Sequence, residues 1–259
     1  MALNRAVAVC SGELLVFLDV RQDVHPDALL ELASCFADPS IGAASGELIL
    51  TSGVGKSAND GLGIYWKIEK IVRRLESQSG SVVGATGAIY ALRRTLFHEI
   101  PANTLLDDVY IPMQAIRDGW RVVFQPSAIA RDQLFAETGK EFSRKVRTLS
   151  GNYQLIRLAP WLLTSENQIL FRFISHKMLR LVVPFLLIAM LFSSAFQGSS
   201  IYKAMFSLQL IFYGLAVLGL WRSVRAFKPV GIAYTFATLN VAALVAFWNF
   251  ISRKQDVWR

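Results

Sequence analysis

The chain has 259 residues, with 27 lysines and arginines against 19 aspartates and glutamates and a net charge of +8. This length leaves room for one large domain or two modest ones. All but one of the acids precede residue 167, so the positive charge belongs to residues 167–259. A basic segment that is mostly apolar and almost free of acids is typical of a membrane protein, and it excludes nucleic acid as the expected partner.

The first predicted strand is residues 14–19, LLVFLD, an unbroken apolar run that ends on Asp19. A helix is predicted over residues 25–36, with Pro26 in its first turn, and a second strand over residues 42–50. A carboxylate at the end of a strand can hold a metal ion or a nucleotide, or it can cap the next helix. The strand alone leaves these alternatives open.

Further along, residues 64–76 have helical spacing, with Ile64, Ile68, Ile71, Val72 and Leu75 on one face. Residues 81–92 form a strand region that contains glycines. Residues 110–119 predict a helix that closes at Gly119, and residues 120–126 predict a strand that Pro126 stops. This alternation predicts an α/β domain with a mostly parallel or mixed sheet and helices on its faces.

One tempting motif is rejected. Residues 53–57, GVGKS, end like a phosphate-binding P-loop, but that motif needs a glycine five residues before its second glycine, and position 50 is leucine. A solvated loop is the better interpretation.

Residues 159–178 predict an amphipathic helix that lies in the membrane interface. Arg172, His176 and Arg180 recur every four residues beside an apolar stripe, so the basic edge would face anionic headgroups. An ordinary buried connector is the alternative.

Three apolar runs follow, over about Leu179–Phe196, Ala204–Trp221 and Val230–Ile251. Each is near the ~20 residues that a transmembrane helix needs. A buried soluble core is the alternative, and three such runs in succession argue against it. The sequence therefore predicts a multi-pass membrane protein.

The basic residues beside these runs predict the orientation. Arg172, Lys177 and Arg180 precede the first run, and three more cations separate the second from the third. By the positive-inside rule the N-terminal domain is cytoplasmic, which indicates the inner (cytoplasmic) membrane. Three spans would then place the basic tail, residues 253–259, outside. Either one run is re-entrant or the tail is an exception to the rule.

Two acidic positions are the candidates for chemistry. Asp19 ends a strand, where open α/β sheets bind ligands. Asp107 and Asp108 precede a helix, where they could equally be N-terminal caps that the helix dipole favours.

The order of these pieces resembles the membrane-bound family-2 glycosyltransferases, the cellulose- and hyaluronan-synthase-like enzymes. The shared pattern is a strand that ends in an acid, the segment GATGAIYALRR, an acidic pair before a helix, and SRKVR ahead of a membrane-entry helix. The resemblance covers essentially the whole chain, and its specificity comes from the order of the motifs.

The resemblance implies roles for individual residues. Asp19 matches the first acid of the family's Asp-x-Asp motif, which binds the donor diphosphate and a divalent metal, Mg²⁺ or Mn²⁺. Arg21 stands in place of the second acid, and it could pair with Asp19 or reach a donor phosphate directly. The need for a metal is therefore open.

Asp108 matches the aspartate of the family's Glu-Asp motif, with Asp107 in place of the glutamate, and this implies that Asp108 is the general base. Arg144 and Arg147 lie where the family has Gln-x-x-Arg-Trp, and Arg147 would contact the diphosphate. Thr148 replaces the tryptophan, which puts chain extension in question. A solvated basic turn is the alternative for this segment.

The resemblance also implies that the family's N-terminal base-binding strands are missing, which would leave residues 2–18 with uncovered apolar surface. We therefore expect a partial GT-A type (Rossmann-like) domain over residues 1–158, the interfacial helix over 159–178, about three transmembrane helices over 179–252 and a tail over 253–259.

The predicted function is inverting glycosyl transfer from a nucleotide-diphosphate sugar, with a UDP-sugar favoured, to a saccharide or lipid-linked acceptor at the membrane. The expected pathway is polysaccharide synthesis. The rival is a non-catalytic membrane scaffold or partner subunit. A transporter is weaker, because none of the three runs contains Asp or Glu.

Overall fold

The structure is a computed structural model that describes residues 2–51, 60–133 and 138–252. It divides into two compact units. The first comprises Met1–Val54, Lys70–Ala136 and Gly151–Lys177, and the second comprises Gly55–Glu69, Glu137–Ser150 and Met178–Arg259. Helices α3 (Asp60–Gln78) and α5 (Thr138–Leu158) each contribute to both units. The rejected P-loop segment and the C-terminal tail lie outside the described residues.

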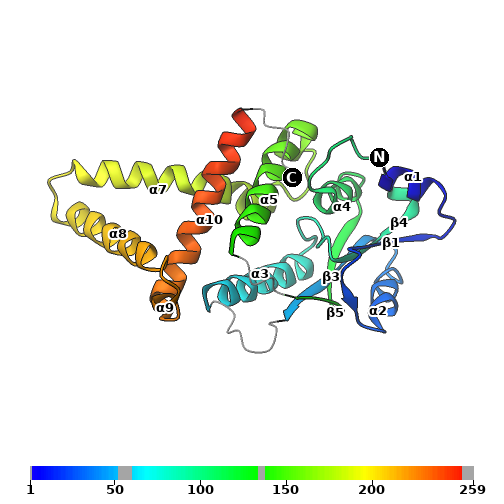
Figure 1. Cartoon of the computed structure of the whole chain (residues 1–259). Coiled ribbons are helices and arrows are strands. Elements are labelled where there is room, and N and C mark those ends of the chain that lie inside the picture. Colours follow the sequence, from blue (N-terminus) through cyan, green and yellow to red (C-terminus); the bar gives the residue numbers. More distant parts are fainter. Residues whose placement is uncertain (1, 52–59, 134–137, 253–259) are drawn as a thin grey trace. The chain divides into compact units, whose positions relative to one another are not determined.

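The first unit is built on a five-stranded sheet (Figure 1). Its strands, in spatial order, are β1 (Leu14–Leu18), β4 (Ile89–Arg93), β3 (Ile41–Thr51), β5 (Arg121–Gln133) and β2 (Asp23–Val24). Strands β3 and β5 run parallel, and the other three pairings are antiparallel. The predicted mixed α/β sheet is confirmed.

Strand β5 does not stop at Pro126, so that prediction was wrong. The strand runs on to Gln133, and its pairing with β3 shifts register where Ser45 and Glu47 face Phe124 and Ile129. Proline has no N–H to donate to a neighbouring strand, and an irregularity of this kind accommodates it. The longer strand carries the chain to Asp132.

The core of this unit lies on both faces of the sheet. Ala43 and Ala44 are neighbours on β3 that point to opposite faces, and both are fully buried. Helix α2 (Ala28–Cys35) packs Ala28 and Leu32 against one face. Helix α4 (Asp107–Arg117) also contacts β3 and β5, and a short 3-10 helix, η1 (Arg94–Leu96), follows β4.

The N-terminal segment leaves apolar surface exposed, as the sequence predicted. Helix α1 (Ala2–Ala8) buries none of its residues. Strand β1 lies at an edge of the sheet and exposes Val16 and Leu18, whereas Leu15 and Phe17 point inward. The strand is therefore buried on one face only, and not on both as its unbroken apolar run predicted.

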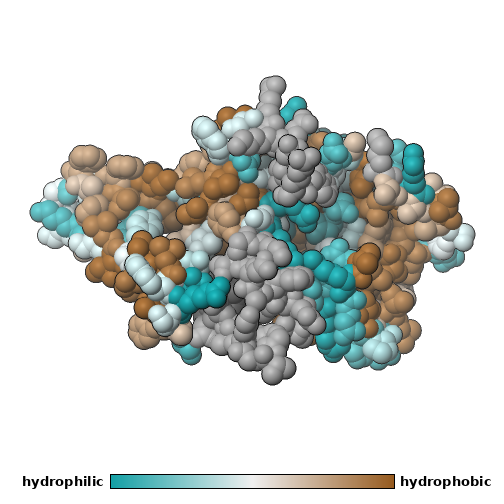
Figure 2. Space-filling view, in the orientation of Figure 1, coloured by the Kyte–Doolittle hydropathy of each residue, from teal (hydrophilic) through white to brown (hydrophobic). Residues whose placement is uncertain are grey.

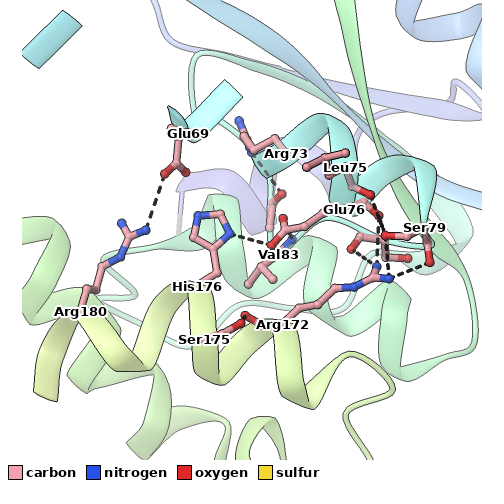
Figure 3. Close-up of polar contacts among 12 residues, drawn as sticks. Glu69, Arg73, Leu75, Glu76, Ser79, Val83, Arg172, Ser175, His176 and Arg180 are labelled. Carbon is pink, nitrogen blue, oxygen red and sulfur yellow. Dashed lines mark hydrogen bonds and ion pairs between the residues drawn. The ribbon is translucent and has the colours of Figure 1, made fainter. Parts of the chain in front are cut away.

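The predicted interfacial helix over residues 159–178 is not a single, separate helix. It consists of η2 (Pro160–Leu163), α6 (Leu170–Phe173) and a π-helical turn, η3 (Ile174–Met178), that leads into α7. The prediction that its basic edge faces headgroups was wrong. Arg172 donates to the backbone carbonyls of Glu76, Ser79 and Ser81, and His176 pairs with Glu76 (Figure 3).

The second unit contains α7 (Leu179–Ala195), α8 (Ser200–Leu218), α9 (Arg222–Arg225) and α10 (Lys228–Ile251). Three helical segments of the described residues are long and apolar enough to cross a membrane: Leu170–Ala195, Ser200–Leu218 and Lys228–Ile251. They correspond to the three predicted spans with shifted ends. Figure 2 shows hydrophobic residues over most of the visible surface of α7 and α8.

Candidate active site

Asp19 and Asp108 come together through two neighbouring residues of the glycine-containing segment. The backbone N–H of Asp19 donates to the carbonyl of Ala88 (3.3 Å), and the backbone N–H of Gly87 donates to Asp108 Oδ2 (3.1 Å). The segment before β4 thus bridges the end of β1 and the start of α4. The backbone of Asp19 and the carboxylate of Asp108, 89 positions apart in the sequence, are therefore bonded to adjacent residues, while the Asp19 side chain is exposed.

Glycine is required where this segment passes α4. Gly84 has φ +78°, a conformation that L side chains rarely adopt, and a Cβ there would lie 3.0 Å from Val109 Cα. At Gly87 a Cβ would lie 3.3 Å from Asp108 Oδ2. The two glycines therefore allow the backbone to approach the first turn of α4.

The loop before α4 is fixed from the other side by α5. Gln154 Oε1 accepts a hydrogen bond from the N–H of Leu105, and its amide group donates to the carbonyl of Asn103 (both 2.8 Å). Gly151 packs against Leu106 so closely that a Cβ would lie 2.5 Å from Leu106 Cγ. These contacts set the position at which Asp107 and Asp108 begin the helix.

The pKa of the Asp108 carboxyl group is raised by its surroundings. Burial, together with the charge of Asp107, raises the pKa of Asp108 to about 6, against the opposing effects of Lys177, Arg73 and the Gly87 N–H. A base is most effective when its pKa lies near the working pH, because it is then ionised and still a good proton acceptor.

Tyr90 lies beside the same two acids. It is buried on β4 and stacks on Phe17 with ring centroids 4.5 Å apart. Burial and the charges of Asp107 and Asp108 raise the pKa of Tyr90 well above its usual range. Its hydroxyl is buried without a hydrogen-bond partner among the described residues.

Arg73 reaches the site from α3. Its guanidinium donates to Ser45 Oγ (3.4 Å) and to the carbonyl of Gly84 (3.3 Å), and it lies over the ring of Phe124. Ser45 Oγ in turn accepts the N–H of Thr86 (3.0 Å). Arg73 is therefore held against the loop that carries Gly87.

Arg21 forms an ion pair with Asp132, a buried acid near the end of β5 (Nε to Oδ2, 3.4 Å). Gln22 donates to the same oxygen (3.5 Å), and its N–H closes the turn on the carbonyl of Asp19 (3.1 Å). The side chain of Arg21 stays about half exposed, at 49%. The sequence left two possible partners for Arg21, which were Asp19 and a donor phosphate. In the structure Arg21 pairs with Asp132, which was neither of them.

These residues do not fit a preformed metal centre. The described part of the chain has no group of three His, Cys, Asp or Glu side chains that could hold a metal ion. Asp19 is an exposed single carboxylate, and a guanidinium stands two residues away, where a second carboxylate would be needed. Asp19 as a metal ligand remains a prediction.

Arg144 and Arg147 lie on α5, in the second unit, and Arg147 is exposed. The segment lies within the helix α5, so it is not the solvated basic turn that was the alternative; the carbonyl of Arg144 also accepts a hydrogen bond from the Thr148 hydroxyl (3.0 Å). Asp19, Arg21, Asp107 and Asp108 belong to the first unit. A shared site for both groups remains a prediction.

The sequence analysis missed Arg73, Tyr90, Asp132 and Lys177 as members of the site. For Arg73 a signal existed. Glu69, Arg73 and Glu76 recur at helical spacing on the face of α3 opposite Ile71, and such a polar stripe predicts an inward polar face as readily as an outward one. No sequence pattern indicated that Asp132 lies at the site, because Asp132 follows Pro126, which was predicted to end the strand.

Comparisons with known proteins identify the fold and the family. A search of curated proteins finds no match. Among solved structures, the chain is similar to a mannosyltransferase from Pyrobaculum calidifontis in complex with GDP-mannose and Mn²⁺, with a TM-score of 0.64 and 19% sequence identity. The match covers 96% of this chain and 65% of that one, so the chain spans slightly less than two thirds of the length of that protein. At this identity the likeness shows the fold.

The family model described as "Glycosyltransferase like family 2" matches residues 1–151, more than half of the chain. The matched segment contains β1, the Gly87–Ala88 bridge and the acids at the start of α4. This chain belongs to the family-2 glycosyltransferases.

Proposed function

We propose that this glycosyltransferase moves a sugar from a nucleoside diphosphate to an acceptor hydroxyl, with inversion at the anomeric carbon. The observation that carries the proposal is that the adjacent residues Gly87 and Ala88 bond the Asp108 carboxylate and the backbone N–H of Asp19, with the pKa of Asp108 raised to about 6. In this proposal Asp19 binds the donor and Asp108 accepts the proton.

Asp108 is the proposed base of the reaction. Its carboxylate takes the proton from the acceptor hydroxyl while the oxygen attacks the anomeric carbon. The bond between that carbon and the diphosphate oxygen breaks, and the nucleoside diphosphate leaves with the electron pair. A base so placed contributes about 10²- to 10⁴-fold to the rate. The Gly87 N–H holds the carboxylate in position.

In this proposal arginine side chains stabilise the negative charge of the leaving diphosphate. Arg21 is held by Asp132 beside Asp19, and a guanidinium matches the geometry of phosphate oxygens. Arg144 and Arg147 add charge from α5, and Asp107 contacts the substrate next to the base. Asp19 binds the donor, as the family resemblance implies, with Mg²⁺ or Mn²⁺ as the ion to be tested.

The reaction takes place at a membrane in this proposal. The three candidate spans follow the catalytic unit directly, and the cations at the start of the first span, Arg172, Lys177 and Arg180, favour a position of this unit on the cytoplasmic side of the inner membrane. The acceptor is a saccharide or a lipid-linked saccharide, and the pathway is polysaccharide synthesis. A UDP-sugar is the donor that we favour. GDP-mannose is a second candidate donor, because the similar mannosyltransferase is in complex with it.

Nucleotide binding by the purified full chain tests the proposal. UDP and GDP are titrated with Mn²⁺, with Mg²⁺ and with EDTA, beside Asp19→Ala and Asp108→Ala. We expect saturable binding that Asp19→Ala weakens and Asp108→Ala leaves nearly unchanged, because of these two acids only Asp19 contacts the donor in this proposal. Absence of binding under every condition overturns the donor site in this chain.

A second candidate function is a scaffold or partner subunit. The exposed Val16 and Leu18 on edge strand β1 favour it, because an uncovered strand edge with apolar side chains is a surface for pairing with another chain. A chain that binds no nucleotide but copurifies with a synthase from its native membrane would support this function instead.

A further inference from the structure

Tyr90 carries a buried hydroxyl that the proposed function does not use. The residue is 2% exposed, and none of the residues that the structure describes is a hydrogen-bond partner of this hydroxyl. A buried hydroxyl without a partner destabilises the folded chain, whereas phenylalanine would fill the same space without that cost. The acceptor for this hydroxyl must therefore come from the groups that surround it.

The ring of Tyr90 is fixed in a row of side chains across one face of the sheet. Tyr90 is paired with Phe17 on β1 and with Ser45 on β3, and side chains directly opposite each other share a face. Its ring lies at 9° to the ring of Phe17, which also stacks on Phe97. Because its neighbours hold the ring, an acceptor must reach the hydroxyl by its own rotation.

The loop that contains Gly87 lies over the same face of the sheet. Thr86 N–H donates to Ser45 Oγ (3.0 Å), and Gly87 N–H donates to Asp108 Oδ2 (3.1 Å). Ser45 is the direct neighbour of Tyr90 on β3. Consecutive residues of one loop therefore contact the neighbour of Tyr90 and the carboxylate of Asp108, which places this carboxylate on the face of the sheet where Tyr90 lies.

The chemistry of the two groups is complementary. Burial and the charges of Asp107 and Asp108 raise the pKa of Tyr90, so its hydroxyl keeps its proton and stays a donor. An ionised carboxylate accepts about four hydrogen bonds, and Gly87 supplies one of them. We propose that the Tyr90 hydroxyl donates a hydrogen bond to the Asp108 carboxylate when Asp108 is ionised, so that the Gly87 N–H and the Tyr90 hydroxyl position the base together.

Other charged groups also act on Asp108. Asp107 disfavours its ionised form, and Lys177 and Arg73 favour it. All three are kept unchanged in the experiment, so that variants at positions 90 and 108 report on this pair. The role of Asp108 as base rests on the proposed function, whereas the hydrogen bond from Tyr90 does not.

Thermal unfolding of the full chain in nanodiscs tests the hydrogen bond without a need for turnover. Tyr90→Phe is measured at pH 4, where Asp108 is protonated, and at pH 7.5, where it is ionised, alone and combined with Asp108→Asn. Tyr110→Phe is the matched control, because it removes a hydroxyl from a 9% exposed tyrosine on α4.

We expect Tyr90→Phe to lower the thermal midpoint at pH 7.5 by about 3–10 °C, as for the loss of a hydrogen bond to a charged group. At pH 4 its midpoint should equal or exceed that of wild type, because no carboxylate then accepts the bond. This pH dependence should disappear in the Asp108→Asn background, and Tyr110→Phe should have the same effect at both pH values. A change for Tyr90→Phe that is equal at both pH values, or one that keeps its pH dependence with Asp108→Asn, overturns the inference.

The pH profile of kcat/KM gives a second readout. Without the Tyr90 hydroxyl the ionised form of Asp108 is less favoured, so the acidic limb should move to higher pH by about one to two units in Tyr90→Phe. A limb that stays in place overturns the positioning role. A wild-type chain without turnover would contradict the proposed function instead, and the unfolding experiment would still decide whether the hydrogen bond forms.

Discussion

The N–H of Gly87 donates to Asp108 Oδ2 over 3.1 Å, and this bond fixes the carboxylate whose pKa is raised to about 6. A general base must be ionised, so the kcat/KM for glycosyl transfer should rise with pH through about 6 and level off above it. Asp108→Asn keeps an acceptor for Gly87 but cannot take a proton. We expect it to lower kcat by about 10²- to 10⁴-fold.

Thermal unfolding separates this effect from misfolding. The pKa of Asp108 is higher in the folded chain than its usual 3.8, so the folded state binds more protons between these values and stability falls as pH rises from 3.8 to about 6. Asp108→Asn should therefore unfold at a higher temperature than wild type at pH 7.5, with no such gain at pH 4. A lower unfolding temperature at both pH values would contradict the assignment.

Asp107 tunes the base through its charge. It is the second cause of the raised pKa of Asp108, after burial. Asp107→Asn removes a negative charge next to Asp108 and so favours the ionised carboxylate, which moves the acidic limb of the kcat/KM profile to lower pH. The measurement is the pH–rate profile of this variant beside wild type. An unchanged limb would mean that the limb reports another group.

The two site glycines should respond differently to alanine. Gly84→Ala places a Cβ in a left-handed conformation and 3.0 Å from the backbone of Val109, so we expect loss of folded protein. The Cβ of Gly87→Ala would lie nearest to the side chain of Asp108, with Oδ2 at 3.3 Å, so this variant should lower kcat and keep a thermal midpoint close to that of wild type. Gly198→Ala is the matched control, because a Cβ at Gly198 would have no atom within 4 Å. Equal loss of stability at 84 and 87 would contradict the distinction.

How far the sequence predicts this protein can be judged from particular residues. Asp19 and Asp108 were found because motif order marks them, and the local patterns place β1, α2, β3 and α4 within a few residues. The partner of Arg21 could not be found, because Asp132 lies 111 positions away and its strand passes a proline. The basic edge at Arg172 and His176 was assigned to lipid because periodicity shows a stripe but not what the stripe faces.

Glu76 and His176 form a buried pair, with side chains 10% and 8% exposed and 2.8 Å between Oε1 and Nδ1. Because His176→Ala leaves the carboxylate of Glu76 without this partner, it should cost about 1–3 kcal/mol of unfolding free energy. That corresponds to about 2–4 °C per kcal/mol in the thermal midpoint. Ser175→Ala, an exposed neighbour in the same turn, is the control and should leave the midpoint unchanged. A midpoint for His176→Ala equal to that of the control would show that the pair contributes no stability.

Arg21 stands where a second carboxylate would help to hold a metal ion, and Asp132 anchors its guanidinium. We therefore expect nucleotide binding in EDTA to weaken by about 10- to 100-fold in Arg21→Ala, as for the loss of a charge-assisted hydrogen bond. Arg21→Asp should bind only when Mn²⁺ is present, because the new carboxylate completes an oxygen ligand pair with Asp19. Arg157→Asp, at an exposed position on α5, makes the same change in net charge and should bind as wild type.

The role of Asp132 is tested through Arg21. If Asp132 acts by positioning the guanidinium, Asp132→Asn should weaken binding in EDTA when Arg21 is present and have no further effect in the Arg21→Ala background. Equal effects in both backgrounds would mean that Asp132 supports the strand and not the arginine. Wild-type binding that requires Mn²⁺ would instead show that Arg21 does not supply the charge a metal supplies, while leaving the donor site itself intact.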